Sequence, residues 1–188
     1  MIAGILLAAG RGTRFGSHKL LHPLADGTPM GLASLRTLMP AVDHTYVVVR
    51  PDDGALIDLL TPHAVTLVRC ADAEAGMGAS LACGVRAARN AQGWLVALAD
   101  MPFIQPATLR AVTDALRHGA PLVAPEFQGK RGHPVGFAAE FFSTLSALSG
   151  NDGAKALLQA ERARLQLLAC EDPGVLRDID VLQALSPA

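Results

Sequence analysis

Cysteine, aromatic side chains and net charge are all scarce in this chain of 188 residues. The three cysteines, Cys70, Cys83 and Cys170, are widely spaced and include no C-x-x-C pair. This excludes a disulfide scaffold and a cysteine zinc site, and favours reduced core thiols in a cytosol. The 16 Lys and Arg residues nearly balance 17 Asp and Glu residues, so the net charge of −1 gives no basic field for nucleic acid. We therefore expect a small substrate and no nucleic-acid partner.

Long apolar runs and a leader segment are also missing. The apolar runs are too short to span a membrane. Residues 2–8 follow Met1 directly, without a basic leader and a cleavage site. The sequence thus predicts a cytoplasmic protein without a membrane partner.

Aliphatic side chains, by contrast, are abundant and are punctuated by glycine and proline. Hydrophobic residues make up 51% of the chain and aromatic residues only 4%, a composition typical of strands that helices bury on both faces. The length suits one domain, so we expect a single α/β domain whose βαβ units wind over a parallel sheet. The predicted strands are residues 45–50, 65–69, 94–99, 122–124 and 165–169, and the clearest predicted helices are residues 30–38 and 106–117.

The most informative stretch, residues 6–19 (LLAAGRGTRFGSHK), joins an apolar strand to a glycine-rich basic loop. Glycines let a backbone turn sharply and approach a ligand closely. Free N–H groups surrounded by cations form an anion site, and a triphosphate is the commonest anion that fills one. The glycines are Gly10, Gly12 and Gly16, and the cations are Arg11, Arg14 and Lys19.

Two better-known phosphate loops fit this stretch poorly. A Walker loop needs a hydroxyl residue after its lysine, whereas Leu20 follows Lys19. A dinucleotide fingerprint is closer, because the glycines follow a strand. However, Pro23 and the turn at residues 26–29 leave no helix whose N-terminus could receive a pyrophosphate. The loop is therefore expected to bind nucleotide phosphate in another way.

A carboxylate follows the apolar residues 94–99, in the sequence Asp100-Met101-Pro102. At the carboxyl end of a buried strand it would lie in the crevice where open α/β sheets bind ligands. Such an aspartate often caps a helix, but the next predicted helix begins several residues later, at Pro106. Asp100 is therefore poorly placed to cap that helix, and we expect it to face the ligand crevice.

Taken together, four motifs resemble the MobA-like NTP transferase family, and most closely its molybdenum cofactor cytidylyltransferases. They are LAAGxGxRxG at residues 7–16 followed by Lys19, GMxxSL at residues 76–81, LxDMP at residues 98–102, and GHP at residues 132–134. The resemblance covers nearly the whole chain. It implies a three-layer αβα fold with a Rossmann-like, mostly parallel sheet of the nucleotidyltransferase type. Residues 1–105 would form the nucleotide-binding half and residues 106–188 the acceptor-binding half.

The resemblance also implies a nucleotide and metal site. Arg14 would contact the β- and γ-phosphates and Lys19 the α-phosphate, while Asp100, with Asp180, would bind Mg²⁺. Two of these assignments keep ordinary alternatives, because residues 76–81 could be a Gly-Ser turn that caps a helix, and Asp180 could cap a final helix. The expected nucleotide-binding residues are Leu7, Ala8, Ala9, Gly10, Arg11, Gly12, Thr13, Gly76, Gly78 and Ser80.

On the acceptor side, the resemblance points to His133, Pro134, Asp152 and Lys155. His133 lies in a glycine-rich basic segment, residues 126–137, which predicts a hairpin or lid over the strand ends. Relatives tend to have GDxGAR where this chain has GNDGAK at residues 150–155. The acid has moved to Asp152, and Lys155 keeps the charge but loses the bidentate fork of arginine.

The expected reaction is attack on the α-phosphorus of a nucleotide by an acceptor phosphate. No general base is required, because a phosphomonoester has a second pKa of about 6 and is largely a dianion at neutral pH. The resemblance implies CTP, molybdopterin, Mg²⁺ and a molybdoenzyme client or its chaperone as partners, and Ala9 favours a pyrimidine because guanylyl-transferring relatives have LAGG. Two alternatives remain open: a sugar- or polyol-phosphate nucleotidyltransferase, and a non-catalytic module that carries nucleotide or molybdopterin.

Overall fold

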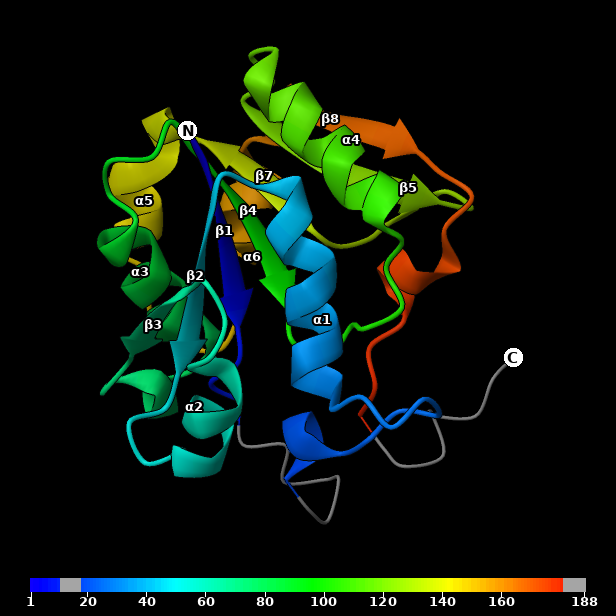
Figure 1. The fold of residues 1–188 in the computed structure, drawn as a ribbon. Helices are drawn as coiled ribbons and strands as arrows, with labels where there is room; N and C mark the ends of the chain where they lie inside the picture. Colours follow the sequence, from blue (N-terminus) through cyan, green and yellow to red (C-terminus); the bar gives the residue numbers. More distant parts are fainter. Residues whose placement is uncertain (11–17, 181–188) are drawn as a thin grey trace.

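The computed structural model describes residues 1–10 and 18–180. Its described part contains one sheet of eight strands with helices on both faces (Figure 1). The strands are β1 (Ile2–Leu7), β2 (His44–Val49), β3 (Thr66–Arg69), β4 (Gly93–Leu98), β5 (Leu122–Phe127), β6 (Lys130–Arg131), β7 (Val135–Ala138) and β8 (Leu165–Ala169). Their order is β3-β2-β1-β4-β7-β5-β6, and β8 pairs with β5. The predicted α/β fold with a mostly parallel sheet is confirmed.

Strands β3, β2, β1 and β4 are parallel, with Ile5 paired to Tyr46 on one side and to Val96 on the other. Strand β7 departs from this pattern, because it lies between β4 and β5 and is antiparallel to both. The predicted hairpin is present as β5 and β6, which pair antiparallel across a turn at Gln128 and Gly129, both with positive φ.

The helices form two layers. Helices α1 (Met30–Leu38), α2 (Gly54–Leu60) and α4 (Pro106–Arg117) bury their leucines in one core, on the face seen in front of the sheet in Figure 1. Helices α3 (Met77–Ala87), α5 (Phe142–Ser146) and α6 (Lys155–Ala160) bury theirs in a second core on the opposite face. Alternate side chains of β1 pack into the two cores, with Leu6 in the first and Ile5 in the second.

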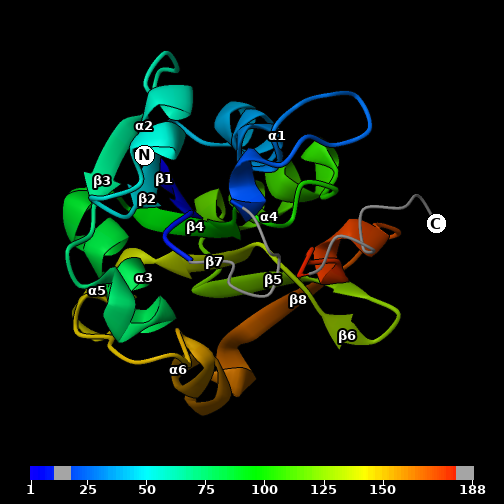
Figure 2. The ribbon, with the colours of Figure 1, turned by 90° about the horizontal axis from the view of Figure 1, so that it is seen from below.

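Close packing sets the position of α3. A Cβ at Gly84 would lie 2.7 Å from Cγ2 of Ile5 and 2.9 Å from Cγ2 of Val48, so only glycine lets the helix approach β1 and β2 this closely. The N-terminus of α3 is thereby brought beside the carboxyl ends of β1, β2 and β4, the edge seen in Figure 2.

In the described part of the chain, no helix is long and apolar enough to cross a membrane. Cys70 is buried, while Cys83 and Cys170 are partly buried, and all three are free thiols. The final short helix expected after Asp180 falls outside the described residues.

Candidate functional site

A cavity of about 610 Å³ opens at the carboxyl ends of β1, β2 and β4, a size typical of small-molecule sites. Its walls come from the β1 end, from the first residue after β2, from the turn into α3 and from the loop before α6. The lining residues are Leu7, Ala8, Ala9, Gly10, Lys19, Leu20, Arg50, Ala73, Glu74, Gly76, Met77, Ser80, Leu98, Asp100 and Asn151.

The backbone after β1 leaves the sheet directly into this cavity. The Ala8 N–H still donates to Val48 O at 2.9 Å, and Ala99 N donates to Leu7 O at 3.1 Å. The predicted nucleotide-binding residues Leu7, Ala8, Ala9 and Gly10 therefore all line the cavity. Arg11, Gly12, Thr13 and Arg14 lie outside the described residues.

Lys19 lies at the centre of the charged part of the site. It begins a short 3-10 turn, Lys19–Leu21, and its Nζ donates to Asp100 Oδ2 at 2.7 Å and to Asp180 Oδ1 at 3.0 Å. Burial alone would lower the pKa of Lys19, but the two carboxylates outweigh it and raise the pKa above its ordinary value. The side chain is therefore a buried ammonium ion at neutral pH.

Two carboxylates thus converge on one point, although 80 residues separate them in sequence. The backbone holds them together, because Ile179 N donates to Asp100 O at 3.0 Å. Carboxylate oxygens are the ligands that Mg²⁺ prefers, usually one or two of them together with water and phosphate oxygens. Within residues 1–10 and 18–180, no group of three or more His, Cys, Asp or Glu side chains could hold a metal. The Asp100 and Asp180 pair therefore suits a cation that is shared with a phosphate ligand.

The turn before α3 packs closely against the loop before α6. Gly76 has φ +111°, and a Cβ there would lie 2.4 Å from both Asn151 Oδ1 and Gly150 O. A Cβ at Gly78 would lie 2.5 Å from Ser149 O, and Gly78 N donates to Gly150 O at 2.8 Å. Gly76 and Ser80 line the cavity, whereas Gly78 packs against the other loop. Both glycines are thus required for this close packing, whatever the cavity binds.

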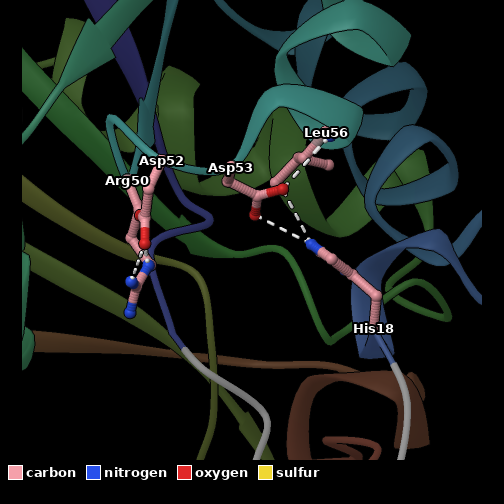
Figure 3. A network of polar contacts seen from close by, with 5 residues as sticks. All are labelled: His18, Arg50, Asp52, Asp53 and Leu56. Atoms are coloured by element: carbon pink, nitrogen blue, oxygen red, sulfur yellow. Dashed lines mark hydrogen bonds and ion pairs between the residues drawn. The ribbon is translucent and has the colours of Figure 1, made fainter.

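Arg50 and Asn151 also line the cavity, although neither was among the expected site residues. Arg50 directly follows β2, and its guanidinium donates to Asp52 from Nε at 3.0 Å and from Nη2 at 2.5 Å (Figure 3). Its Nη2 also lies 3.8 Å from Glu74 Oε1. The available signal for Arg50 was its place at the carboxyl end of a strand beside β1.

A smaller hollow of about 280 Å³ adjoins the cavity and shares Lys19 and Arg50 with it. Here His18 Nε2 lies 2.8 and 2.9 Å from the two carboxylate oxygens of Asp53 (Figure 3). Asp53 also caps α2, since its Oδ1 accepts from Leu56 N at 3.2 Å. The residue before Lys19 is thus tied to the start of α2.

The expected acceptor residues are dispersed. His133 precedes Pro134 through a cis peptide bond, and its N–H donates to Val175 O. Its Nδ1 is buried without a hydrogen-bond partner in the described part of the molecule. Burial and then Arg131 lower the pKa of His133 to about 4, while Asp100 opposes the shift. Asp152 is exposed, and Lys155 lines a third cavity, of about 440 Å³, together with Arg131 and Arg162. None of the four lines the cavity of about 610 Å³.

Comparison with known proteins identifies relatives in sequence. Residues 4–166 match the MobA-like NTP transferase domain. The chain is 33% identical over 196 residues to the purine catabolism protein PucB of Bacillus subtilis, covering 95% of this chain and 91% of PucB. A molybdenum cofactor guanylyltransferase of Burkholderia ambifaria is 40% identical over 121 residues, which cover 61% of this chain and 57% of that protein.

Solved structures agree with this result. The nucleotidyl transferase Mth528 of Methanothermobacter superposes with a TM-score of 0.84 at 28% identity, over 98% of this chain and 94% of that one. Rv0371c of Mycobacterium tuberculosis, in complex with manganese, superposes with a TM-score of 0.79 at 28% identity, over 97% and 95% of the two chains. The fold is therefore that of the nucleotidyltransferases, and the chain belongs to the MobA-like NTP transferase family.

Proposed function

We propose that the protein is a nucleotidyltransferase that transfers CMP from CTP to the terminal phosphate of molybdopterin and releases pyrophosphate. The observation that carries the proposal is the convergence of Asp100 and Asp180 on the ammonium of Lys19, which lines the cavity of about 610 Å³ together with Asp100. A buried ammonium beside two carboxylates is suited to a phosphate-bound cation and to the charge of a leaving phosphate.

In the proposed reaction, an oxygen of the acceptor phosphate attacks the α-phosphorus of the nucleotide. A new P–O bond forms while the bond from the α-phosphorus to its bridging oxygen breaks, and pyrophosphate leaves with that electron pair. The acceptor dianion has no proton to give up, so the chain need not supply a general base. Lys19 would neutralise charge at the reacting phosphate, and the rigid strand ends would hold the two anions in line.

Asp100 and Asp180 are the residues that would hold Mg²⁺, which when bound would offset the charge of the phosphate oxygens. The convergence of their oxygens on one Lys19 ammonium supports this assignment. The structural neighbour Rv0371c was solved in complex with manganese, a divalent cation, which also supports the assignment.

The choice of base rests on the backbone after β1. Ala8, Ala9 and Gly10 line the cavity. The Ala8 N–H is already bonded to Val48 O, so the backbone of Ala9 and Gly10 would contact a base edge. Ala9 stands where guanylyl-transferring relatives have the first glycine of LAGG, and this favours CTP. The relative named as a molybdenum cofactor guanylyltransferase makes GTP the competing nucleotide and supports molybdopterin as acceptor.

Pyrophosphate release tests the proposal. CTP, GTP and UTP are each incubated with molybdopterin, a sugar 1-phosphate or a polyol phosphate, with Mg²⁺ or with EDTA. We expect release with CTP, molybdopterin and Mg²⁺, and none with EDTA. Pyrophosphate release with a sugar or polyol phosphate, and not with molybdopterin, would show that molybdopterin is not the acceptor. Binding of CTP without release under any condition would favour a carrier module over an enzyme.

A further inference from the structure

The short segment that carries Lys19 is attached to the molecule on both sides. Downstream, Leu20 is buried against α1, where a Cβ at Gly31 would lie 3.3 Å from both its Cβ and its carbonyl oxygen. Met30 N also donates to His22 O at 3.0 Å. Upstream, the contact from His18 Nε2 to Asp53 ties the segment to α2.

The upstream attachment is rigid at its Asp53 end. That carboxylate is already oriented by its bond from Leu56 N, and its side chain is only 12% exposed. Helix α2 in turn buries Leu56, Ile57 and Leu60 in the core. His18 therefore meets an acceptor whose position is fixed by a capped and packed helix.

We propose that His18 and Asp53 are positioning residues that hold the backbone of Lys19 so that its ammonium reaches the reacting phosphate. This inference rests on the proposed function of Lys19. The contact is half exposed at His18, and pairs of this kind contribute little to stability. Its effect on turnover is larger, because a displacement of about 1 Å in a catalytic group can cost about 10²-fold in rate.

The test compares two substitutions at one position. His18→Leu removes the ring nitrogen, whereas His18→Gln keeps a nitrogen donor the same number of bonds from Cα. Asp53→Ser keeps a side chain that caps helices well but is too short to reach His18. His44→Leu is the matched control, since His44 Nε2 makes a contact of the same length, 2.8 Å, to Thr66 Oγ1 at the far edge of the sheet.

We expect His18→Leu and Asp53→Ser to lower kcat for pyrophosphate release about tenfold, with KM for the nucleotide changed less than about threefold. His18→Gln should recover most of the loss, and the double variant His18→Leu/Asp53→Ser should be no worse than either single variant. His44→Leu should match the original chain. Equal kcat in His18→Leu and the original chain, or equal impairment in the Leu and Gln variants, would overturn the proposal.

A second readout separates this proposal from the proposed function. If the original chain releases no pyrophosphate with any nucleotide and acceptor, the proposed function fails. The positioning role is then judged by calorimetric binding of inorganic pyrophosphate, which His18→Leu should weaken about fivefold and His18→Gln should not. Equal affinities in all variants would reject it.

Discussion

The two charged regions of the molecule differ in how their cations are held. In the cavity of about 610 Å³, Lys19 is bound by Asp100 and Asp180, and Arg50 by Asp52. In the third cavity, Arg131, Lys155 and Arg162 make no ion pair or side-chain hydrogen bond within the described residues. In the first region, ion pairs within the chain orient the cationic side chains before any ligand binds. In the second region, the cationic side chains are solvated. We infer that catalysis depends on the first region and that the second region attracts the anionic acceptor.

Removing the central cation or its partner should have the largest effect. Lys19→Ala and Asp100→Asn should each lower kcat on the order of 10²-fold or more, because each removes a positioned charge. Steady-state pyrophosphate release measures this, with thermal unfolding as the check on folding. Lys155→Ala, from the other region, is the comparison variant. If it lowered kcat as much as Lys19→Ala does, the two regions would not differ in their importance for catalysis.

The close packing between the turn before α3 and the loop before α6 can be tested at Gly76. Gly76→Ala places a side chain at φ +111° and within 2.4 Å of two oxygens, which should lower the free energy of unfolding by about 2–4 kcal/mol. Gly54→Ala is the control, since a Cβ there meets no atom within 4 Å and should stabilise by about 0.4–1 kcal/mol. Denaturant unfolding decides, and an unchanged midpoint for Gly76→Ala would contradict the packing described.

Charges from both regions act on the pKa of His133, which Arg131 lowers and Asp100 raises. Folding lowers its pKa from the ordinary 6.5 to about 4, so below pH 6.5 the unfolded chain binds a proton that the folded chain does not. The free energy of unfolding therefore falls as the pH drops from about 6.5 to about 4, by up to about 3 kcal/mol from this group. In His133→Leu the loss between these pH values should be smaller. An identical pH profile would show that the ring is not buried in its neutral form.

The smallest effects are expected for the solvated cations. Lys155→Ala and Arg162→Ala should raise KM for an anionic acceptor about threefold and leave kcat unchanged, as for a single exposed charge. The difference in KM between these variants and the original chain should become smaller at high salt, because exposed charges are screened. A change that persists in molar salt would indicate a specific contact instead of attraction.

Much of the fold was predictable because the signals are local. Helix α1 begins and ends where the spacing of its leucines predicts, and Pro106 fixes the start of α4. The insertion of β7 between β4 and β5 was not predictable, since a four-residue strand carries no information about which distant strand it will pair with.

The site divides in the same way. Lys19, Asp100 and the backbone after β1 were selected because they belong to motifs with fixed spacing. Arg50 and Asn151 were missed, because their place in the cavity follows from how strands and loops assemble and no motif marks them. The contact between His18 and Asp53 was missed for the same reason, because it joins two turns that are 35 residues apart.

The bond from Lys19 to Asp180 spans 161 residues, and this has a consequence for biosynthesis. During synthesis Lys19 leaves the ribosome early and Asp180 late, so this bond can form only after nearly the whole chain has been made. Until then, Lys19 has only Asp100 of its two carboxylate partners. Chains that stop short of residue 180 should therefore release pyrophosphate more slowly than the full chain, because the proposed cation site would lack one of its two carboxylates.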